Sequence, residues 1–322
     1  MATGENADND EFMTNTNRQV PTLIHPGYPK TGTTFLQKAV FKDRSLFRIL
    51  WSIDEINRHV VRPNELHFNV EEARRALDDA QANIPPSPVD VISSENLVGN
   101  PLFGARDSVQ MVERLKSLFP TAKILLTVRA QPSMAKSIYI QYVKRGGLMK
   151  PEQFFAQELT PGYYGFEQNF LEYHWLVEKY AELFGEDNVL VLPQEFLLSE
   201  RDRFLSILLS FCFGKDSTAT LNIPPDKRIG VSPPLSGLPL MRFGNRFRED
   251  ALNPGTSSGF SWLGQIAYKI GYRQKLFASR YDRQMKSLIG KVFKDQFASS
   301  NIRLQKFCPV DLTSFGFDLG NR

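Results

Sequence analysis

The chain has 322 residues, 42% of them apolar, and can bury a core for one large α/β domain or two smaller ones. Its 39 basic and 35 acidic residues give a net charge of +4, which suits an anionic small molecule and does not indicate a nucleic-acid partner. Two cysteines, both in apolar settings, predict buried free thiols rather than a disulfide framework. Neither a signal segment nor an apolar run near the roughly 20 residues of a membrane helix is found. We therefore expect a cytoplasmic protein without a membrane span.

The first feature along the chain is a glycine turn between a strand and a helix. Residues 1–19 are polar and acidic, which predicts a disordered leader, and a short buried strand is predicted at 20–24. The segment 25–38, HPGYPKTGTTFLQK, then turns into a helix near Phe35. Unpaired N–H groups and the helix dipole favour an anion there, Lys30 adds a positive charge, and hydroxyl donors come from Thr31, Thr33 and Thr34. We expect a phosphate or sulfate cradle rather than a simple capped turn.

Strands and helices alternate over the next part of the chain. Strands are predicted at 89–93, 123–129 and 188–192, helices at 70–82, 100–119, 132–143, 163–184 and 204–212, and short helical pieces with loop at 43–62. This alternation predicts an α/β fold with a central parallel sheet flanked by helices. A proline-rich loop follows at 223–239, and a basic amphipathic helix at 265–306 is expected to be a solvated face covering the sheet. We expect one domain over 20–322, helical from about 221.

A second motif, TVRAQPSMAKS, ends the strand predicted at 123–129. In an open α/β sheet, ligands bind at the carboxyl ends of the strands, so Arg129 is expected to share a crevice with the cradle. A guanidinium with the hydroxyl of Ser137 suits a terminal phosphate. Taken alone, the pair is equally well explained by a surface arginine and a serine bonded within its helix.

Together these motifs resemble those of sulfotransferases that use 3′-phosphoadenosine 5′-phosphosulfate (PAPS). PKTGTT resembles their 5′-phosphosulfate loop, and the interval from Arg129 to Ser137 matches their 3′-phosphate motif. The resemblance covers roughly 20–213, and the tail from 301 through 317 resembles the closing segment of many bacterial sulfotransferases. It implies a three-layer P-loop-like fold that binds PAPS and its product, 3′-phosphoadenosine 5′-phosphate (PAP). The implied cofactor contacts are Lys30, Thr31, Gly32, Thr33, Thr34, Arg129 and Ser137.

Glu95 follows the strand predicted at 89–93. By itself it is most simply a carboxylate at a helix start after Ser94. Sulfotransferases carry a catalytic histidine at the equivalent place, and glycan-modifying members use a glutamate. The resemblance therefore implies that Glu95 is the base and that Lys30 stabilises developing charge, during in-line transfer to a hydroxyl or amine of a carbohydrate or small metabolite. It implies no metal.

The four histidines are less well placed than Glu95. His25 is expected only to pack or hydrogen-bond beneath the cradle, and His174 to be structural. His59 and His67 remain weaker alternatives as the base. Five aromatic residues either line an acceptor cleft or belong to the core: Tyr139, Tyr142, Tyr163, Tyr164 and Phe166.

Two features depart from the sulfotransferase pattern. Pro193-Gln194-Glu195 stands where an aromatic residue stacks on adenine, and the late basic glycine motif is absent unless 227–230 replaces it. A P-loop kinase is the main alternative, but Thr33 stands where its lysine belongs and Arg129 where an acidic Mg²⁺ partner belongs. A nucleotide- or glycan-binding module without turnover is the other alternative. The oligomeric state is not readable from the sequence.

Overall fold

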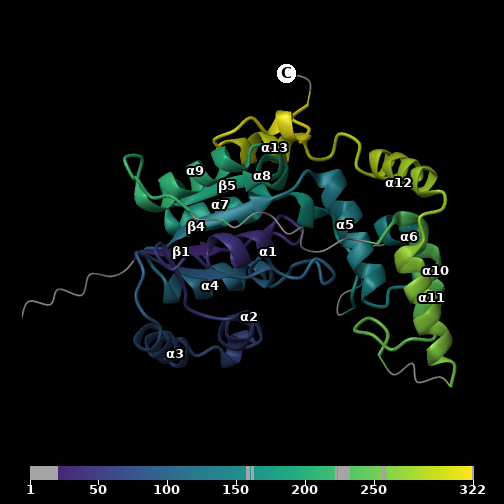
Figure 1. Cartoon of the computed structure of the whole chain (residues 1–322), viewed down its shortest axis with the longest axis horizontal. Helices are drawn as coiled ribbons and strands as arrows, with labels where there is room; N and C mark the ends of the chain where they lie inside the picture. Colours follow the sequence, from purple (N-terminus) through teal and green to yellow (C-terminus); the bar gives the residue numbers. More distant parts are fainter. Residues whose placement is uncertain are drawn as a thin grey trace, which may run out of the picture.

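A five-stranded parallel sheet forms the centre of the molecule (Figure 1). The computed structural model describes residues 21–156, 160, 163–221, 223, 233–254 and 259–320. The strands are β1 (Thr22–His25), β2 (Phe47–Ile49), β3 (Val89–Ser93), β4 (Lys123–Val128) and β5 (Val189–Pro193), in the order β2-β3-β1-β4-β5. Ile24 of β1 pairs with Ile92 on one side and Ile124 on the other. Since the strands are parallel, the segments that follow β1, β3 and β4 lie at one edge of the sheet.

Helices cover both faces of this sheet, which confirms the predicted three-layer α/β fold. Its helices are α1 (Thr33–Phe35), α2 (Ile53–Ile56), α3 (Val70–Asn83), α4 (Ser108–Leu118), α5 (Gln131–Lys144), α6 (Pro151–Ala156), α7 (His174–Phe184), α8 (Gln194–Ser199) and α9 (Arg201–Phe213). On one face, α4 packs against α3 and α7, and α7 contacts β4 and β5. On the other face α9 meets α1, where the Arg201 guanidinium lies 5.3 Å from the centre of the Phe35 ring.

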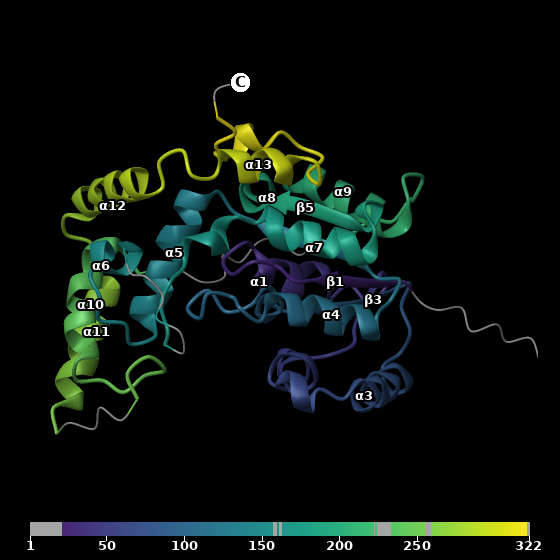
Figure 2. The same cartoon turned by 180° about the vertical axis from the view of Figure 1, so that it is seen from behind.

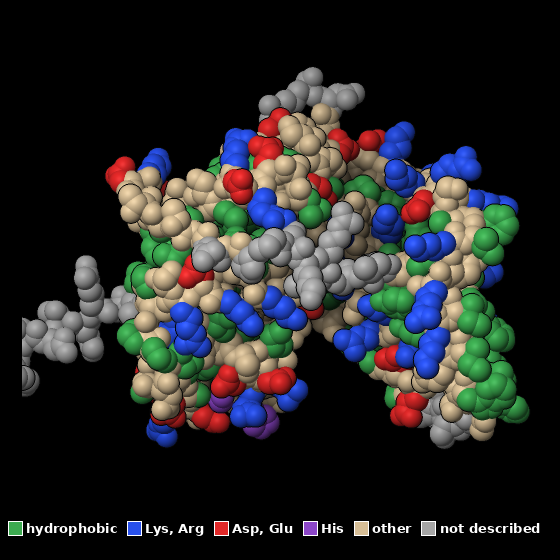
Figure 3. Space-filling model, in the orientation of Figure 1, with side chains coloured by type: hydrophobic (Ala, Val, Ile, Leu, Met, Phe, Trp, Pro, Cys, Tyr) green, Lys and Arg blue, Asp and Glu red, His purple; other side chains and the backbone are tan. Residues whose placement is uncertain are grey.

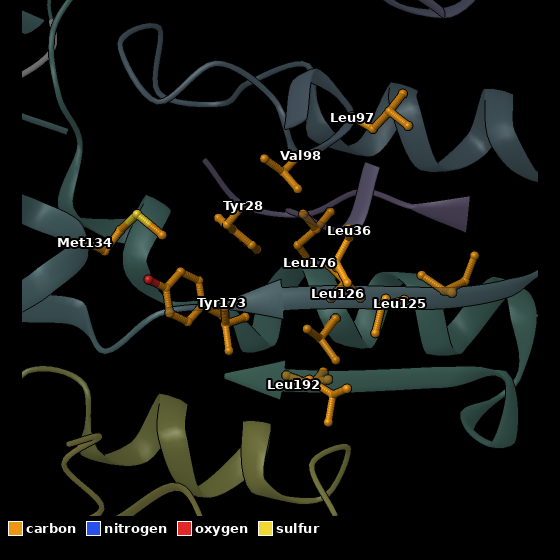
Figure 4. Close-up of a cluster of buried hydrophobic side chains, with 14 of the residues drawn as sticks. Tyr28, Leu36, Leu97, Val98, Leu125, Leu126, Met134, Tyr173, Leu176 and Leu192 are labelled. Carbon is orange, nitrogen blue, oxygen red and sulfur yellow. The ribbon is translucent and has the colours of Figure 1, made fainter. Parts of the chain in front are cut away.

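The core fills the space between the sheet and these helices. Figure 4 shows part of it, with buried side chains from β4, β5 and α7 around Tyr28 and Tyr173. Cys212 and Cys308 are buried free thiols, as predicted, and burial raises the pKa of each to about 12. Within the described residues, no helix is long and apolar enough to cross a bilayer. The cytoplasmic location stays a prediction.

The C-terminal helices form a separate group beside the sheet. They are α10 (Leu238–Asn245), α11 (Ser261–Arg273), α12 (Ala278–Val292) and α13 (Ala298–Gln305). α10 pairs with α11, and α12 packs against α5 and α6, on the side where the strands end (Figures 1 and 2). α13 returns toward the sheet layers, where it contacts α7. The prediction that residues 265–306 form a helix covering the sheet is therefore wrong, because its first two helices pack on other helices.

Three further predictions of secondary structure are wrong. The segment 43–62 contains the strand β2, which is short and holds a buried ion pair between Arg48 and Asp90 of β3. The helix predicted over 100–119 begins only at Ser108, because Gly104 and Ala105 have positive φ. The long helix predicted over 163–184 is replaced by loop, a 3₁₀ turn at Gln168–Leu171 and α7. The predicted leader at 1–19 and the alternative basic motif at 227–230 lie outside the described residues.

Candidate active site

The loop from Pro29 to Thr34 joins β1 to α1 and has a conformation suited to binding an anion. Lys30 has φ 64° and Gly32 has φ 90°, both in the left-handed region. A Cβ on Gly32 would lie 2.8 Å from a methyl carbon of Leu197, so glycine fits both the backbone and the space. The backbone N–H groups of residues 30–34 have no acceptor among the residues that the structure describes. They stand ahead of a helix start, where such donors attract negative charge.

The three threonines of this loop have different surroundings. The Thr31 side chain is fully buried: its hydroxyl donates to the carbonyl oxygen of Tyr28 at 2.5 Å and lies 2.7 Å from the hydroxyl of Thr127. That hydroxyl therefore ties the loop to β4, and the backbone N–H is what Thr31 can offer to a ligand. Thr33 is buried and Thr34 is half-buried.

His25 joins the ends of three strands beneath the loop. Its Nδ1 lies 2.8 Å from the hydroxyl of Ser93 on β3, and its Nε2 lies 3.2 Å from the hydroxyl of Thr127 on β4. Burial lowers the pKa of His25 to about 3, so the ring is neutral near pH 7. A Cβ on Gly27 would lie 2.6 Å from Nε2 of this ring, so only glycine fits above it. The packing role predicted for His25 is confirmed.

The other three histidines lie away from the loop. His59 stacks on Trp51, His67 bonds Asn64, and His174 bonds Ser300. None of them lines the cavity described below. Within the described part of the chain, no group of three His, Cys, Asp or Glu side chains could hold a metal ion.

Arg129 lies between the loop and α5. Its Nη1 donates to the hydroxyl of Ser137 at 2.7 Å and lies 3.5 Å from the carbonyl oxygen of Lys30. The sequence predicted that these three residues meet, and the structure brings them together. The Nε of Arg129 lies 3.8 Å from Oε1 of Glu195 and makes no hydrogen bond within the described residues. Burial lowers the pKa of Arg129, and the carboxylate of Glu195 opposes that shift.

Lys30, Glu95 and Ser137 line one cavity of about 910 Å³. Ser94 caps the short 3₁₀ helix that Glu95 begins, and the Glu95 side chain is exposed to this space. Burial lowers the pKa of Lys30, as do the charges of Lys144, Arg145 and Arg129, whereas the Glu95 carboxylate raises it. The cavity therefore brings a carboxylate near a lysine ammonium, beside the edge of the anion loop.

The walls of this cavity combine aromatic, apolar and basic residues. Tyr163 and Tyr164 line it, together with Leu102, Phe103, Arg62 and Arg145. Tyr139, Tyr142 and Phe166 are buried in the core instead. The sequence left open whether these five aromatic residues line a cleft or belong to the core. Tyr163 and Tyr164 line the cleft, and the other three belong to the core.

Several residues at this site were not identified from the sequence. Thr127 holds Thr31 and His25, and the hydroxyl of Tyr173 donates to the carbonyl oxygen of Arg129 at 2.8 Å. Glu195 contacts both the Arg129 side chain and the N–H of Ala130. Since Glu195 lies two residues after the end of β5, the same strand-end rule that selected Arg129 could have selected it.

No family model and no curated protein matches the chain. The structure is similar to a sulfotransferase from Alicyclobacillus acidocaldarius, with TM-score 0.46 and 17% identity over 82% of this chain and 99% of the other. It is similar to mouse sulfotransferase SULT7A1 complexed with PAP, with TM-score 0.37 and 12% identity over 90% of each chain. A sulfotransferase domain from the curacin biosynthetic pathway gives TM-score 0.38 and 12% identity over 93% of this chain and 98% of the other. All three are sulfotransferases.

Proposed function

We propose that this protein is a PAPS-dependent sulfotransferase that transfers a sulfuryl group to a hydroxyl or amine acceptor. The observation that supports it most is the meeting of two anion-binding elements with a carboxylate. Arg129 bonds Ser137 beside the carbonyl of Lys30, and Lys30, Ser137 and Glu95 line one cavity. The resemblance of both motifs to those of sulfotransferases supports the same assignment.

The residues present fit this cofactor. The free N–H groups of residues 30–34, with the Lys30 ammonium, suit the 5′-phosphosulfate. At Arg129, Nη1 is held by Ser137 while Nη2 has no acceptor among the described residues, so guanidinium donors remain for the 3′-phosphate. When bound, PAPS supplies the activated sulfuryl group and a nucleotide leaving group.

Two side chains of the cavity, Glu95 and Lys30, carry out the catalysis. Glu95 accepts the proton of the acceptor hydroxyl or amine, for which the acceptor must come within hydrogen-bond reach of its carboxylate. Lys30 and the loop N–H groups stabilise the charge that develops on the sulfuryl group and on the leaving oxygen. By analogy with phosphoryl transfer, positioning and electrostatics supply most of the acceleration, and this chemistry needs no metal.

The acceptor binds in the same cavity, as a carbohydrate or other small molecule. Its volume of about 910 Å³ lies within the range of ligand pockets, roughly 300–1,000 Å³. The rings of Tyr163, Tyr164 and Phe103 suit the faces of a sugar or another ring. A kinase is disfavoured, because Thr33 follows Gly32 and Arg129 follows β4 at the positions where a lysine and an acidic residue are needed.

Thermal unfolding with PAP, compared with ATP and Mg²⁺, tests the cofactor. PAP alone should raise the melting temperature, and Lys30→Ala or Arg129→Ala should remove that shift, while Arg75→Ala on α3 should keep it. Stabilisation by Mg²⁺–ATP instead would contradict the proposal and favour a kinase. Stabilisation by neither would remove the support for a nucleotide site.

Transfer from radiolabelled PAPS to a panel of sugar, amine and phenol acceptors tests the base. Glu95→Gln should lower turnover by about 10²- to 10⁴-fold, the usual contribution of a general base, and leave PAP binding intact. The control Glu71→Gln, in the exposed first turn of α3, should keep full activity. PAP binding without transfer to any acceptor would favour a non-catalytic module, and unchanged turnover in Glu95→Gln would exclude Glu95 as the base.

A further inference from the structure

The pair of helices α10 and α11 turns an apolar face away from the molecule. Gly264, Ala267 and Gly271 of α11 are buried, and the two glycines lie against α10. A Cβ on Gly237, just before α10, would lie 1.7 Å from the carbonyl oxygen of Gly271. The two backbones are therefore so close at this contact that only glycine fits. The opposite side of α11 carries Trp262, Leu263, Ile266 and Ile270, which are 57%, 40%, 47% and 54% exposed. Their i, i+1, i+4, i+8 spacing places them on one stripe.

This apolar surface extends beyond α11. Nearly half of the exposed large hydrophobic side chains of the described residues lie between Phe243 and Phe277, and we call these the outer face: Phe243, Phe260, Trp262, Leu263, Ile266, Ile270, Leu276 and Phe277. Phe277 has φ 59°, an unusual backbone conformation for an aromatic residue, and its ring is exposed. Figure 3 shows hydrophobic side chains gathered along this edge of the molecule, with Lys and Arg side chains beside them. A continuous patch of this kind is characteristic of an interaction site.

The charged residues closest to α11 in the sequence are basic, and Glu249, Asp250 and Asp282 lie just outside the stretch 251–281. From residue 251 to residue 281 the sequence contains no Asp or Glu, and its basic residues are Lys269, Arg273, Lys275 and Arg280. Two of these belong to α11 itself, one before and one after Ile270. Trp, Leu and Ile on one helix face with Lys and Arg at its border are the composition of helices that lie in a membrane interface.

We propose that the outer face binds the surface of an anionic phospholipid bilayer, with α11 lying in the plane of the headgroups. Charge complementarity favours this occupant over a second copy of the chain. Two copies joined through this face would bring Lys269 and Arg273 of each α11 near the same basic residues of the other, and α11 itself has no carboxylate to compensate them. Anionic headgroups compensate the same cations and accept the apolar side chains beneath them. The proposal does not depend on sulfuryl transfer.

Flotation with vesicles tests the proposal on the full chain. It should bind vesicles of phosphatidylcholine mixed with an equal amount of phosphatidylglycerol, and binding to phosphatidylcholine alone or in high salt should be much weaker. The double variant Lys269→Gln/Arg273→Gln should lower partitioning about 30-fold, from roughly 1 kcal/mol for each cation at an anionic surface. Ile266→Gln/Ile270→Gln should lower it at least about tenfold.

Matched controls separate this surface from general exposure and charge. Leu66→Gln and Leu198→Gln change exposed leucines elsewhere, and Arg75→Gln/Lys215→Gln removes two exposed cations elsewhere; both sets should keep binding. In a Trp175→Phe background, Trp51 stays buried and Trp262 is exposed, so the tryptophan emission should shift to the blue on vesicle binding because of Trp262. Vesicle binding that the α11 variants leave unchanged would overturn the proposal. So would a dimer that Ile266→Gln/Ile270→Gln converts to a monomer, because the face would then be a self-association surface.

Discussion

His25 makes the stability of the fold depend on pH in one direction. A histidine in the unfolded chain has a pKa of 6.5, whereas burial lowers the pKa of His25 to about 3 in the folded protein. Between these values the unfolded chain binds a proton that the folded chain does not, so acidification favours unfolding. Stability is therefore lost as the pH falls from 6.5 toward 3, and His25 adds no pH dependence above that window.

The size of the effect follows from the width of the window. Each pH unit below 6.5 removes about 1.4 kcal/mol per group from the free energy of unfolding. Between about pH 7.5 and about pH 5, His25 alone should therefore cost about 2 kcal/mol. Solvent does not weaken this effect, because the His25 side chain is fully buried between Ser93 and Thr127.

Urea unfolding at the two pH values, followed by circular dichroism, measures this loss. Other groups also titrate there, so the quantity of interest is the difference between the wild type and His25→Asn. The variant should lose about 2 kcal/mol less than the wild type. His67→Asn, which removes an exposed histidine, should keep the wild-type loss. An identical loss in His25→Asn would refute the reasoning. If that variant does not fold, an NMR titration of the wild type decides, since a His25 imidazole that titrates near 6.5 would refute the reasoning equally.

Two further perturbations test the packing. Asp90→Ala should lower the free energy of unfolding in urea by about 3–5 kcal/mol, because it leaves Arg48 buried without its carboxylate. The double variant Arg48→Met/Asp90→Leu should recover much of that loss. If the single and the double variant are equally unstable, the ion-pair argument is wrong. Gly237→Ala should destabilise by about 1–3 kcal/mol, since its Cβ would lie 1.7 Å from a carbonyl of Gly271. Gly290→Ala, with open space around it, should stabilise by about 0.5–1 kcal/mol, and melting temperatures that do not separate the two would refute the packing argument.

The parts of the fold that the sequence predicted are those with strong local patterns. The strands at 89–93 and 123–128 are rich in β-branched and aliphatic residues, and α3 and α5 have clear helical starts or stops. The short strand β2 has no such pattern: its central residue is Arg48, which is buried only because Asp90 pairs with it from a distant part of the chain. Single-sequence periodicity does not reveal a long-range ion pair.

The same distinction holds at the site. Lys30, Arg129 and Ser137 were found because their chemistry is concentrated in two short motifs, and the strand-end rule then predicted that the motifs meet. Tyr173 and Thr127 act on these motifs from elsewhere, through single hydrogen bonds to a carbonyl and a hydroxyl. Single hydrogen bonds of this kind produce no recognisable motif or residue spacing in the sequence. The cavity walls are similar, since Arg62, Phe103 and Arg145 come from three separate segments.

Glu195 lies beside Arg129 and affects how its guanidinium is held. Burial lowers the pKa of Arg129, and Glu195 opposes that shift, so the carboxylate helps to keep the guanidinium charged. Its Oε1 lies 3.8 Å from Nε and makes no bidentate pair, and Nη1 is already held by Ser137. The guanidinium is therefore fixed along two sides while Nη2 keeps its donors for a ligand. A closer, bidentate carboxylate would occupy those donors, so this looser contact is compatible with the phosphate binding that we propose for Arg129.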